Sequence, residues 1–268
     1  TIDAPASKSM THRVLLLGAL ADGQSMIRNP LSAEDTDATC EVLSLLGVEM
    51  ENKSGVWRLQ GGELHASSEP LDCRESGTTL RLMTAICGLI NGDSILTGRP
   101  SLRSRPIQPL LNALKHIGVD SKSYKGFPPV TVQGTGVIRG GATELPGNIS
   151  SQYVSALLTV APLAEDPVEI NLTTSLESKP YVEMTLHAMR LFGVEPYVSP
   201  NLMRFEVPTK RYSATDVRVE GDWSSAAFLL AAGALTGEVT VTGLDPKSAQ
   251  ADKAIIEILL QMGADVKV

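Results

Sequence analysis

The sequence predicts an α/β fold assembled from repeats of one helix-and-strand unit. The first observation is a glycine that ends an amphipathic run in the same way at four places, Gly47, Gly118, Gly193 and Gly263. The spacings between these glycines are 71, 75 and 70 positions. Glycine directly after such a run is typical of a left-handed helix C-cap, and the residues that follow it begin a strand. Near-equal spacing of this signature favours a repeat.

The second observation is an earlier helix that recurs in each unit and is rich in leucine and alanine. These helices are expected over residues 13–20, 78–89, 151–163 and 224–235. A short alternating strand follows each one, as in Ser94–Thr97. The unit is therefore helix, strand, loop, helix, and one or two strands. An ordinary open α/β fold with coincidental similarity is the weaker alternative, because the same signature occurs four times.

The fourth unit stops at Val268, where its closing strand would begin. A fold made of paired or threefold repeats is not expected to end there. The first residue is Thr1 instead of an initiating methionine. We therefore expect the chain to be the N-terminal portion of a longer protein, with a few leading residues missing.

The composition is typical of a globular protein, with 43% hydrophobic and 20% charged residues among 268. No apolar run is long enough to span a membrane, and the N-terminus has no secretory signal. Cys40, Cys73 and Cys87 match neither a zinc spacing nor a disulfide framework, which favours a cytoplasmic location. The net charge of −7 gives no general attraction to nucleic acid or membranes, so local positive charge must hold any anionic ligand.

Motifs for a metal or a nucleotide cofactor are absent from the sequence. The four histidines have no ligand partners at metal spacing, and neither a P-loop motif nor GxGxxG after a strand occurs. Tyr153 and Tyr181 do not belong to an aromatic platform for nucleic-acid bases. We therefore expect no metal, no cofactor and no nucleic-acid partner.

Polar residues gather at the starts of the predicted helices. Serine and threonine there usually act as N-caps, which is the expectation for the fourth start, Glu220–Ser225. The first three starts add charge or backbone access, for example Lys8 and Arg13 in the first and Gly77 in the second. Unpaired N–H groups at a helix N-terminus suit phosphate or carboxylate, so neighbouring helices would direct their N-termini at one anion site. Arg81 lies one turn into its helix, and it is as well suited to a structural salt bridge as to a contact with the ligand.

Two loops between a strand and a helix end in a basic residue and proline. Arg103–Pro106 places two arginines before a helix that Pro106 can begin, and Ser178–Tyr181 occupies the same place in the third unit. Arginine binds carboxylate or phosphate with two hydrogen bonds, although most surface arginines are simply solvated. Because two equivalent loops share the pattern, we expect both to bind a ligand.

Six motifs, in order along the whole chain, resemble those of the 5-enolpyruvylshikimate-3-phosphate synthase family of enolpyruvyl transferases. They are Pro5–Arg13, Ser76–Arg81, Arg105–Ile107, Ser150–Gln152, Ser178–Tyr181 and Glu220–Asp222. The resemblance implies an inside-out α/β barrel of repeated βαβαββ units, three per domain, with two domains closing over the substrates. It implies that residues 9–217 form one complete domain, and that residues 1–8 and 218–268 form part of a second.

The implied reaction transfers the enolpyruvyl group of phosphoenolpyruvate to the 5-hydroxyl of shikimate 3-phosphate and releases phosphate. Lys8 would contact both substrates and act in catalysis, and Gln152 would also reach both. Gly77 and Arg105 would bind phosphoenolpyruvate. The residues expected on the shikimate 3-phosphate side are Ser9, Arg13, Ser150, Ser151, Ser178 and Tyr181. The partners would be these two small molecules, with no membrane partner, and the protein would be a monomer.

Three positions depart from the family pattern. Ala6 stands where glycine is usual, Leu82 stands where many relatives have proline, and Glu75 stands where asparagine is frequent. Glu75 places a carboxylate near an anionic ligand, and we expect Arg74 to neutralise it. The acidic groups of the family's proton transfers would follow Val268, so the chain alone should bind the shikimate phosphate without turnover.

Two other functions remain as alternatives. The sister enzyme that transfers enolpyruvyl to a UDP-sugar would be expected to carry a loop cysteine, and Cys73 and Cys87 are not placed for that role. A non-catalytic binding module is the alternative from a different class of protein. The sequence that follows Val268 in the complete protein discriminates between the enzyme and the module.

Overall fold

The computed structural model describes residues 1–268, and its larger body contains three four-stranded sheets. The first has the order β13 (Asp216–Arg218), β2 (Gly23–Arg28), β4 (Val56–Gly61) and β3 (Glu49–Lys53). The second has the order β5 (Leu71–Asp72), β6 (Asn91–Thr97), β8 (Phe127–Thr135) and β7 (Asp120–Tyr124). The third has the order β9 (Gly141–Leu145), β10 (Val168–Leu172), β12 (Arg204–Val207) and β11 (Tyr197–Val198). The α/β class is confirmed.

All three sheets have the same strand directions. A parallel pair comes first in each, namely β13 with β2, β5 with β6 and β9 with β10. The next two pairings in every sheet are antiparallel. The first sheet differs in one respect, because its first strand comes from far along the chain and pairs Val217 with Ile27.

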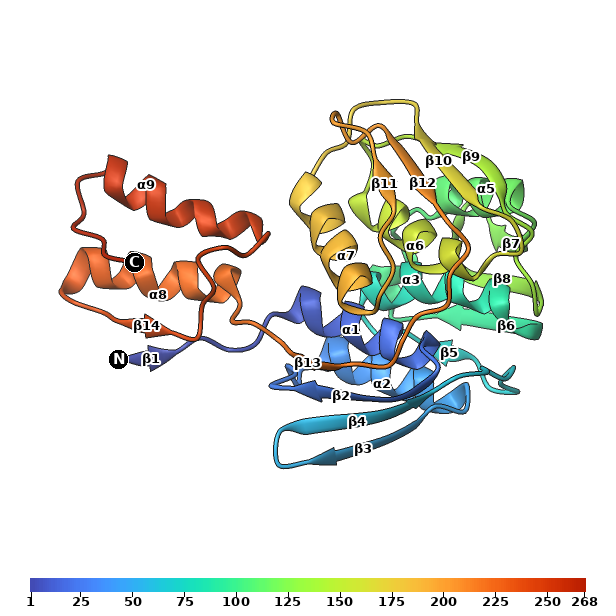
Figure 1. Cartoon of the computed structure of the whole chain (residues 1–268), viewed down its shortest axis with the longest axis horizontal. Helices are drawn as coiled ribbons and strands as arrows, with labels where there is room; N and C mark the ends of the chain where they lie inside the picture. Colours follow the sequence, from blue (N-terminus) through green and yellow to red (C-terminus); the bar gives the residue numbers. More distant parts are fainter.

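Three helices form the interior of the larger body: α1 (Lys8–Leu20), α3 (Gly77–Ile86) and α6 (Ser151–Val160). In α1 every residue from Met10 to Leu20 is buried. Figure 1 shows these helices inside the larger body with the sheets around them. Strands such as β8 alternate buried and exposed side chains, so each sheet covers the helices with one face and meets solvent with the other.

The larger body contains four further helices. α2 (Glu34–Leu45), α5 (Gln108–His116) and α7 (Lys179–Leu191) each precede a strand, and the short α4 (Pro100–Arg103) precedes α5. The 3₁₀ turns Cys87–Leu89 and Ala161–Leu163 continue α3 and α6 to the ends expected from the sequence. The first helix is longer than expected, because Ser7 accepts a hydrogen bond from Met10 N and caps a helix that begins at Lys8.

The glycine caps are confirmed by the backbone. The φ angles are 93° at Gly47, 95° at Gly118, 83° at Gly193 and 91° at Gly263. These values lie in the left-handed region, where a side chain is disfavoured. The recurring glycine is therefore required by the conformation that ends each helix.

A smaller body holds both ends of the chain. Its parallel strands are β1 (Ile2–Asp3) and β14 (Val241–Thr242), and its helices are α8 (Trp223–Thr236), the 3₁₀ helix Ala251–Ala254 and α9 (Ile255–Gln261). Figure 1 shows α8 and α9 at the left, away from the sheets of the larger body. The main hydrophobic core runs from Ala6 to Val219 and includes no residue of α8 or α9.

Two chain segments connect the larger body to the smaller one, and these segments lie side by side. Ser7 N donates to Glu220 O at 2.8 Å, and Asp222 N donates to Pro5 O at 2.7 Å. The Asp222 carboxylate accepts from Ser225 N at 2.7 Å and from Lys8 N at 3.3 Å, so it caps α8 and also contacts the start of α1. This confirms the N-capping expected at the fourth helix start.

Side chains on α8 are apolar and largely uncovered. Phe228 is 80% exposed and Leu235 is 84% exposed. No helix in the structure is both long and apolar enough to cross a membrane.

Candidate functional site

A cavity of about 230 Å³ lies where the starts of α1, α3, α6 and α7 meet. It collects most of the residues that the sequence analysis singled out. The predicted residues that line it are Ser9, Arg13, Ser150, Ser151, Gln152, Ser178 and Tyr181. Thr78, Arg81, Leu82, Ile149 and Ser155 complete the lining. The convergence of helix N-termini is therefore present for α1, α3 and α6.

Arg13 is a buried cation on the wall of this cavity, with 4% of the residue exposed. Its Nε donates to Thr185 Oγ1, its Nη1 to Ser9 O and its Nη2 to Tyr181 O, each at 2.8 Å. All three acceptors are neutral, and Arg13 has no ion pair with a carboxylate. Burial lowers the pKa of Arg13 to about 10. A buried guanidinium without a counter-ion is costly, and an anionic ligand in the cavity would supply one.

Serine hydroxyls in the cavity differ in how they are used. Ser150 Oγ accepts from Gln152 N at 3.3 Å and caps α6. Ser178, by contrast, begins α7 without a side-chain cap, and its φ of 54° is unusual for a residue other than glycine. Strained backbone of this kind concentrates at ligand sites. Ser178 and Ser151 therefore have hydroxyls free to donate to a ligand.

Gln152 connects α6 to α3. Its Nε2 donates to Thr78 Oγ1 at 3.0 Å, and its Oε1 accepts from Arg81 Nη1. Arg81 forms no salt bridge, and its Nε is buried without a partner. Burial lowers the pKa of Arg81, Tyr153 opposes that change, and the charge of Arg105 nearby acts in the same direction as burial. From the sequence, a salt bridge and a ligand contact are equally expected for Arg81. The structure shows no salt bridge at this residue.

Gly77 lies at the border of the cavity as the first residue of α3. A methyl group in place of its hydrogen would lie 3.2 Å from Arg105 Nη1, 3.4 Å from Arg81 Nη1 and 3.7 Å from Gln152 Oε1. Its φ is not in the left-handed region, so conformation does not require glycine here. The space above Gly77 is instead enclosed by two guanidinium groups and an amide, an arrangement suited to an anion.

Three predicted residues do not line the cavity, namely Gly77, Arg105 and Lys8, and Lys8 has a partner elsewhere. Its Nζ lies 2.9 Å from Asp35 Oδ2 on α2, and half of its side chain is exposed. Asp35 also accepts a hydrogen bond through its backbone oxygen from Thr79 of α3, at 3.4 Å. The pair therefore lies beside the α3 start that carries Gly77. Asp35 could not be predicted as a partner of Lys8, because nothing in the spacing of residues 8 and 35 indicates a contact.

Glu75 is not neutralised by its neighbour. The expectation that Arg74 would do so is wrong, because Arg74 Nη2 pairs with Glu41 of α2. Arg74 has a φ of 51°, and its backbone oxygen accepts from Arg99 N, so this residue turns away from the α3 start. Glu75 instead accepts a hydrogen bond from Ser101 Oγ of α4.

A buried chain of side-chain hydrogen bonds connects the helices behind the site. His12 Nδ1 lies 2.8 Å from Thr39 Oγ1, which lies 2.7 Å from Thr79 Oγ1. Thr79 Oγ1 in turn donates to Ser76 Oγ at 2.6 Å. Burial lowers the pKa of His12 to about 3, Asp35 opposes that change, and Arg13 and Lys8 add to it. The imidazole is therefore neutral in the folded protein.

This neutral histidine predicts a loss of stability in acid. Between pH 6.5 and 3 the unfolded chain binds a proton that the folded chain excludes, so the free energy of unfolding falls as the pH falls. At pH 5 the loss relative to pH 8 is about 2 kcal/mol from His12 alone. In His12→Gln the free energy of unfolding should fall less between pH 8 and pH 5 than in the wild-type protein, by about 2 kcal/mol. Denaturant unfolding at the two pH values measures this difference. Exposed His187→Gln serves as the control, and an unchanged pH dependence in His12→Gln would contradict the assignment.

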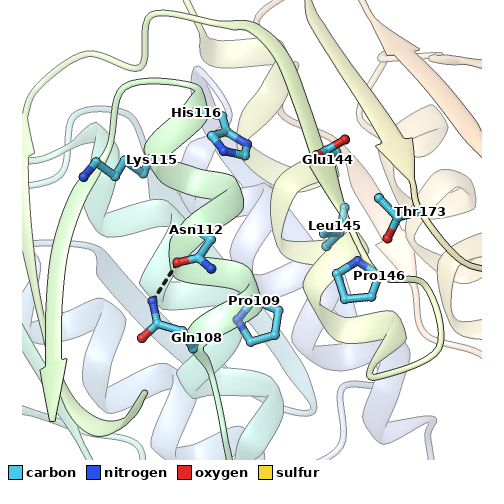
Figure 2. Close-up of a pocket in the computed structure, with 9 residues that line it drawn as sticks. All are labelled: Gln108, Pro109, Asn112, Lys115, His116, Glu144, Leu145, Pro146 and Thr173. Atoms are coloured by element: carbon cyan, nitrogen blue, oxygen red, sulfur yellow. Dashed lines mark hydrogen bonds between the residues drawn. The ribbon is translucent and has the colours of Figure 1, made fainter. Parts of the chain in front are cut away.

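A second cavity, of about 500 Å³, lies elsewhere, between α5 and the end of β9 (Figure 2). Figure 2 shows Lys115 and His116 on the α5 side and Glu144 on the other. Gln108 Nε2 donates to Asn112 Oδ1 at 2.7 Å, so these two amides satisfy each other. This cavity has a cation and a carboxylate in its lining and no buried arginine, and we assign the candidate site to the smaller cavity.

Known proteins resemble this chain over its whole length. The sequence matches the family model described as EPSP synthase (3-phosphoshikimate 1-carboxyvinyltransferase) over residues 1–268. A protein named 3-phosphoshikimate 1-carboxyvinyltransferase from Methanocorpusculum labreanum is 44% identical over 99% of this chain and 63% of its own length. One of the same name from Methanothermobacter thermautotrophicus is 42% identical over 100% of this chain and 64% of its own length.

Solved structures are similar over the whole chain. An EPSP synthase from Acinetobacter baumannii superposes with a TM-score of 0.85 at 29% sequence identity, covering 100% of this chain and 60% of that one. The chain thus spans somewhat less than two thirds of the length of the relatives that it matches.

Proposed function

Because the chain belongs to the EPSP synthase family, we propose that the full-length protein transfers the enolpyruvyl group of phosphoenolpyruvate to shikimate 3-phosphate. The observation that carries this proposal is the set of arginines at the converging helix starts, Arg13, Arg81 and Arg105. None of the three forms a salt bridge with a carboxylate, although Arg13 is buried. Three positive charges without counter-ions suit two polyanionic substrates held side by side.

The proposed place of shikimate 3-phosphate is the cavity itself. Arg13 would face its phosphate, and the free hydroxyls of Ser151 and Ser178 would donate to the phosphate oxygens. Ser9, Ser150 and Tyr181 complete the lining on this side. Hydrogen bonds from a cation and from hydroxyls to a phosphate are charge-assisted, and they are stronger than bonds between neutral groups.

Phosphoenolpyruvate would lie over Gly77, between Arg105 and Gln152. The absence of a side chain at Gly77 leaves room there, and Arg105 Nη1 is the nearest atom to that space. In the proposed reaction the 5-hydroxyl loses its proton and its oxygen attacks C2 while C3 gains a proton. The tetrahedral intermediate then loses phosphate from C2 and a proton from C3, which restores the double bond of the enolpyruvyl group. Lys8 would be the catalytic group from this chain, because its exposed ammonium can exchange Asp35 for a substrate oxygen.

The repeat and the domain division are also part of the proposal. Residues 9–217 would be a complete domain of three βαβαββ units arranged as an inside-out barrel, which the shared strand order of the three sheets supports. Residues 1–8 and 218–268 would belong to a second domain, which the limits of the hydrophobic core support. The exposed apolar side chains of α8 are of the kind that another folded segment covers. A monomer and a cytoplasmic location remain predictions from the sequence.

Binding of shikimate 3-phosphate tests the proposed site. In the full-length protein it should bind without phosphoenolpyruvate, because Arg13, Ser150, Ser151 and Ser178, which are proposed to hold its phosphate, all lie in residues 9–217. Replacing Ser151 with alanine removes one donor to the phosphate and should weaken binding by roughly 1.5–3 kcal/mol. Calorimetry measures this directly. Ser155→Ala is not a suitable control, because Ser155 Oγ accepts from Thr185, so the exposed Ser104→Ala serves instead. Unchanged affinity in Ser151→Ala would count against the site.

A further inference from the structure

We propose that Tyr153 is a positioning residue that holds Arg81 and Arg105 around one anion subsite above Gly77. The inference rests on the proposed function, in which phosphoenolpyruvate lies at that place. Tyr153 is on α6, next to Gln152, and is fully buried. Tyr153 itself does not line the cavity, so it would act through the two arginines.

The ring of Tyr153 supports Arg81. Cζ of Arg81 lies 5.3 Å from the ring centroid, within the range of a cation–π contact. Gln152 Oε1 accepts from Nη1 of the same guanidinium, and Nε has no partner. The guanidinium is thus held by a ring on one side and an amide on another, without any carboxylate that would compete with a ligand.

The hydroxyl of the same tyrosine supports Arg105. It donates to the backbone oxygen of Pro106 at 2.6 Å. On either side of this bond, Arg105 N donates to Leu102 O at 3.0 Å and Ile107 N donates to Gly126 O at 2.9 Å. The tyrosine hydroxyl is therefore the connection between this exposed loop and the buried helix α6, and it fixes the backbone directly after Arg105.

The arrangement needs such a support because the two arginines repel each other. Arg105 Nη1 and Arg81 Nη1 lie 3.2 and 3.4 Å from one point above Gly77. Two guanidinium groups this close to each other repel and move apart unless neighbouring groups hold them in place. An anion can bridge the two only if both remain beside it. Tyr153 contacts Arg81 through its ring and contacts the backbone directly after Arg105, at Pro106 O, through its hydroxyl, so a single side chain acts on the positions of both. The ligand class is a phosphate or carboxylate group that accepts from both.

Tyr153→Phe in the full-length protein removes the hydroxyl that donates to Pro106 O and keeps the ring beside Arg81. The KM for phosphoenolpyruvate should rise about five- to tenfold, since a displaced positioning group costs binding and rate. The Kd of shikimate 3-phosphate, measured alone by calorimetry, should stay within about twofold, since the side chain of Tyr153 makes no hydrogen bond to Arg13 or to the serines. The Kd of inorganic phosphate, titrated with shikimate 3-phosphate saturating, should rise by the same factor as the KM.

Tyr212→Phe is the matched control. Tyr212 is also fully buried, and its hydroxyl donates to Thr159 O at 3.0 Å, near the far end of the same helix. Tyr212→Phe should lower the thermal stability by a similar amount. It should leave the KM for phosphoenolpyruvate, the Kd of shikimate 3-phosphate and the Kd of inorganic phosphate unchanged. If Tyr153→Phe changes the phosphate Kd no more than Tyr212→Phe does, or weakens both substrates equally, the positioning role is overturned.

Two further results keep the inference separate from the proposed function. Tyr153→Leu also removes the ring, so it should weaken phosphate binding further than Tyr153→Phe, and equal values for the two would contradict the contact with Arg81. A wild-type protein without turnover would overturn the proposed function alone, because the phosphate titration still compares Tyr153→Phe with Tyr212→Phe.

Discussion

Replacing Arg105 with alanine in the full-length protein is expected to lower kcat/KM for phosphoenolpyruvate by about 10²–10³-fold. Arg105 Nη1 is the nearest atom to the space above Gly77, and no carboxylate pairs with it. A guanidinium that binds an anion with two hydrogen bonds stabilises the phosphate that leaves in the reaction. Steady-state kinetics with each substrate varied in turn measures the effect.

Arg103→Ala is the control for this prediction. Arg103, the last residue of α4, is exposed two positions earlier in the same segment, and it likewise has no salt bridge. Its replacement should leave kcat/KM within about twofold, as is usual for surface positions away from a site. Equal losses in the two variants would mean that the loop's charge, and not the place of Arg105, determines activity. The Kd of shikimate 3-phosphate should be unchanged in both.

Replacing Arg13 with methionine should weaken shikimate 3-phosphate binding by about 100-fold, because a buried charge-assisted contact to the phosphate is lost. The expected effect on stability without ligand is much smaller. Removing a buried cation that lacks a counter-ion offsets the loss of its bonds to Thr185 Oγ1, Ser9 O and Tyr181 O. A purely structural arginine would give the reverse, a large fall in melting temperature with little change in affinity.

Thermal unfolding with and without ligand distinguishes these outcomes. Shikimate 3-phosphate should raise the melting temperature of the wild-type protein in proportion to its binding free energy. In Arg13→Met the same ligand concentration should give almost no rise. A rise equal to that of the wild type would place the phosphate away from Arg13.

The sequence was sufficient to predict the helix ends and the helix starts. Glycine at residues 47, 118, 193 and 263 has a local cause, the left-handed backbone, and local causes are visible in the sequence. The residues that line the cavity were found for a similar reason, since Arg13, Ser151 and Ser178 all stand at or near helix starts. These features depend on a few neighbouring residues.

Contacts between distant segments could not be predicted in this way. The strand at Asp216–Arg218 completes a sheet that begins near residue 23, and no spacing in the sequence indicates this pairing. Lys8 was expected among the cavity residues, whereas its ammonium pairs with Asp35 on another helix. Both contacts are set by tertiary packing.

In one case the adjacency of two residues in the sequence led to a wrong prediction. Arg74 and Glu75 are adjacent, but the left-handed backbone at Arg74 separates their side chains, and each finds a partner on a different helix. Tyr153 was dismissed as an aromatic platform for bases. Its contacts with the two arginine segments depend on the placing of α6 against α3 and the loop before α5.

The most direct test of the central claim is the release of phosphate by the full-length protein that contains this chain. With phosphoenolpyruvate and shikimate 3-phosphate both present, we expect one phosphate released for each shikimate 3-phosphate consumed, and none when either substrate is omitted. Phosphate release from phosphoenolpyruvate that does not depend on shikimate 3-phosphate, or no release from the pair, would contradict the proposed function.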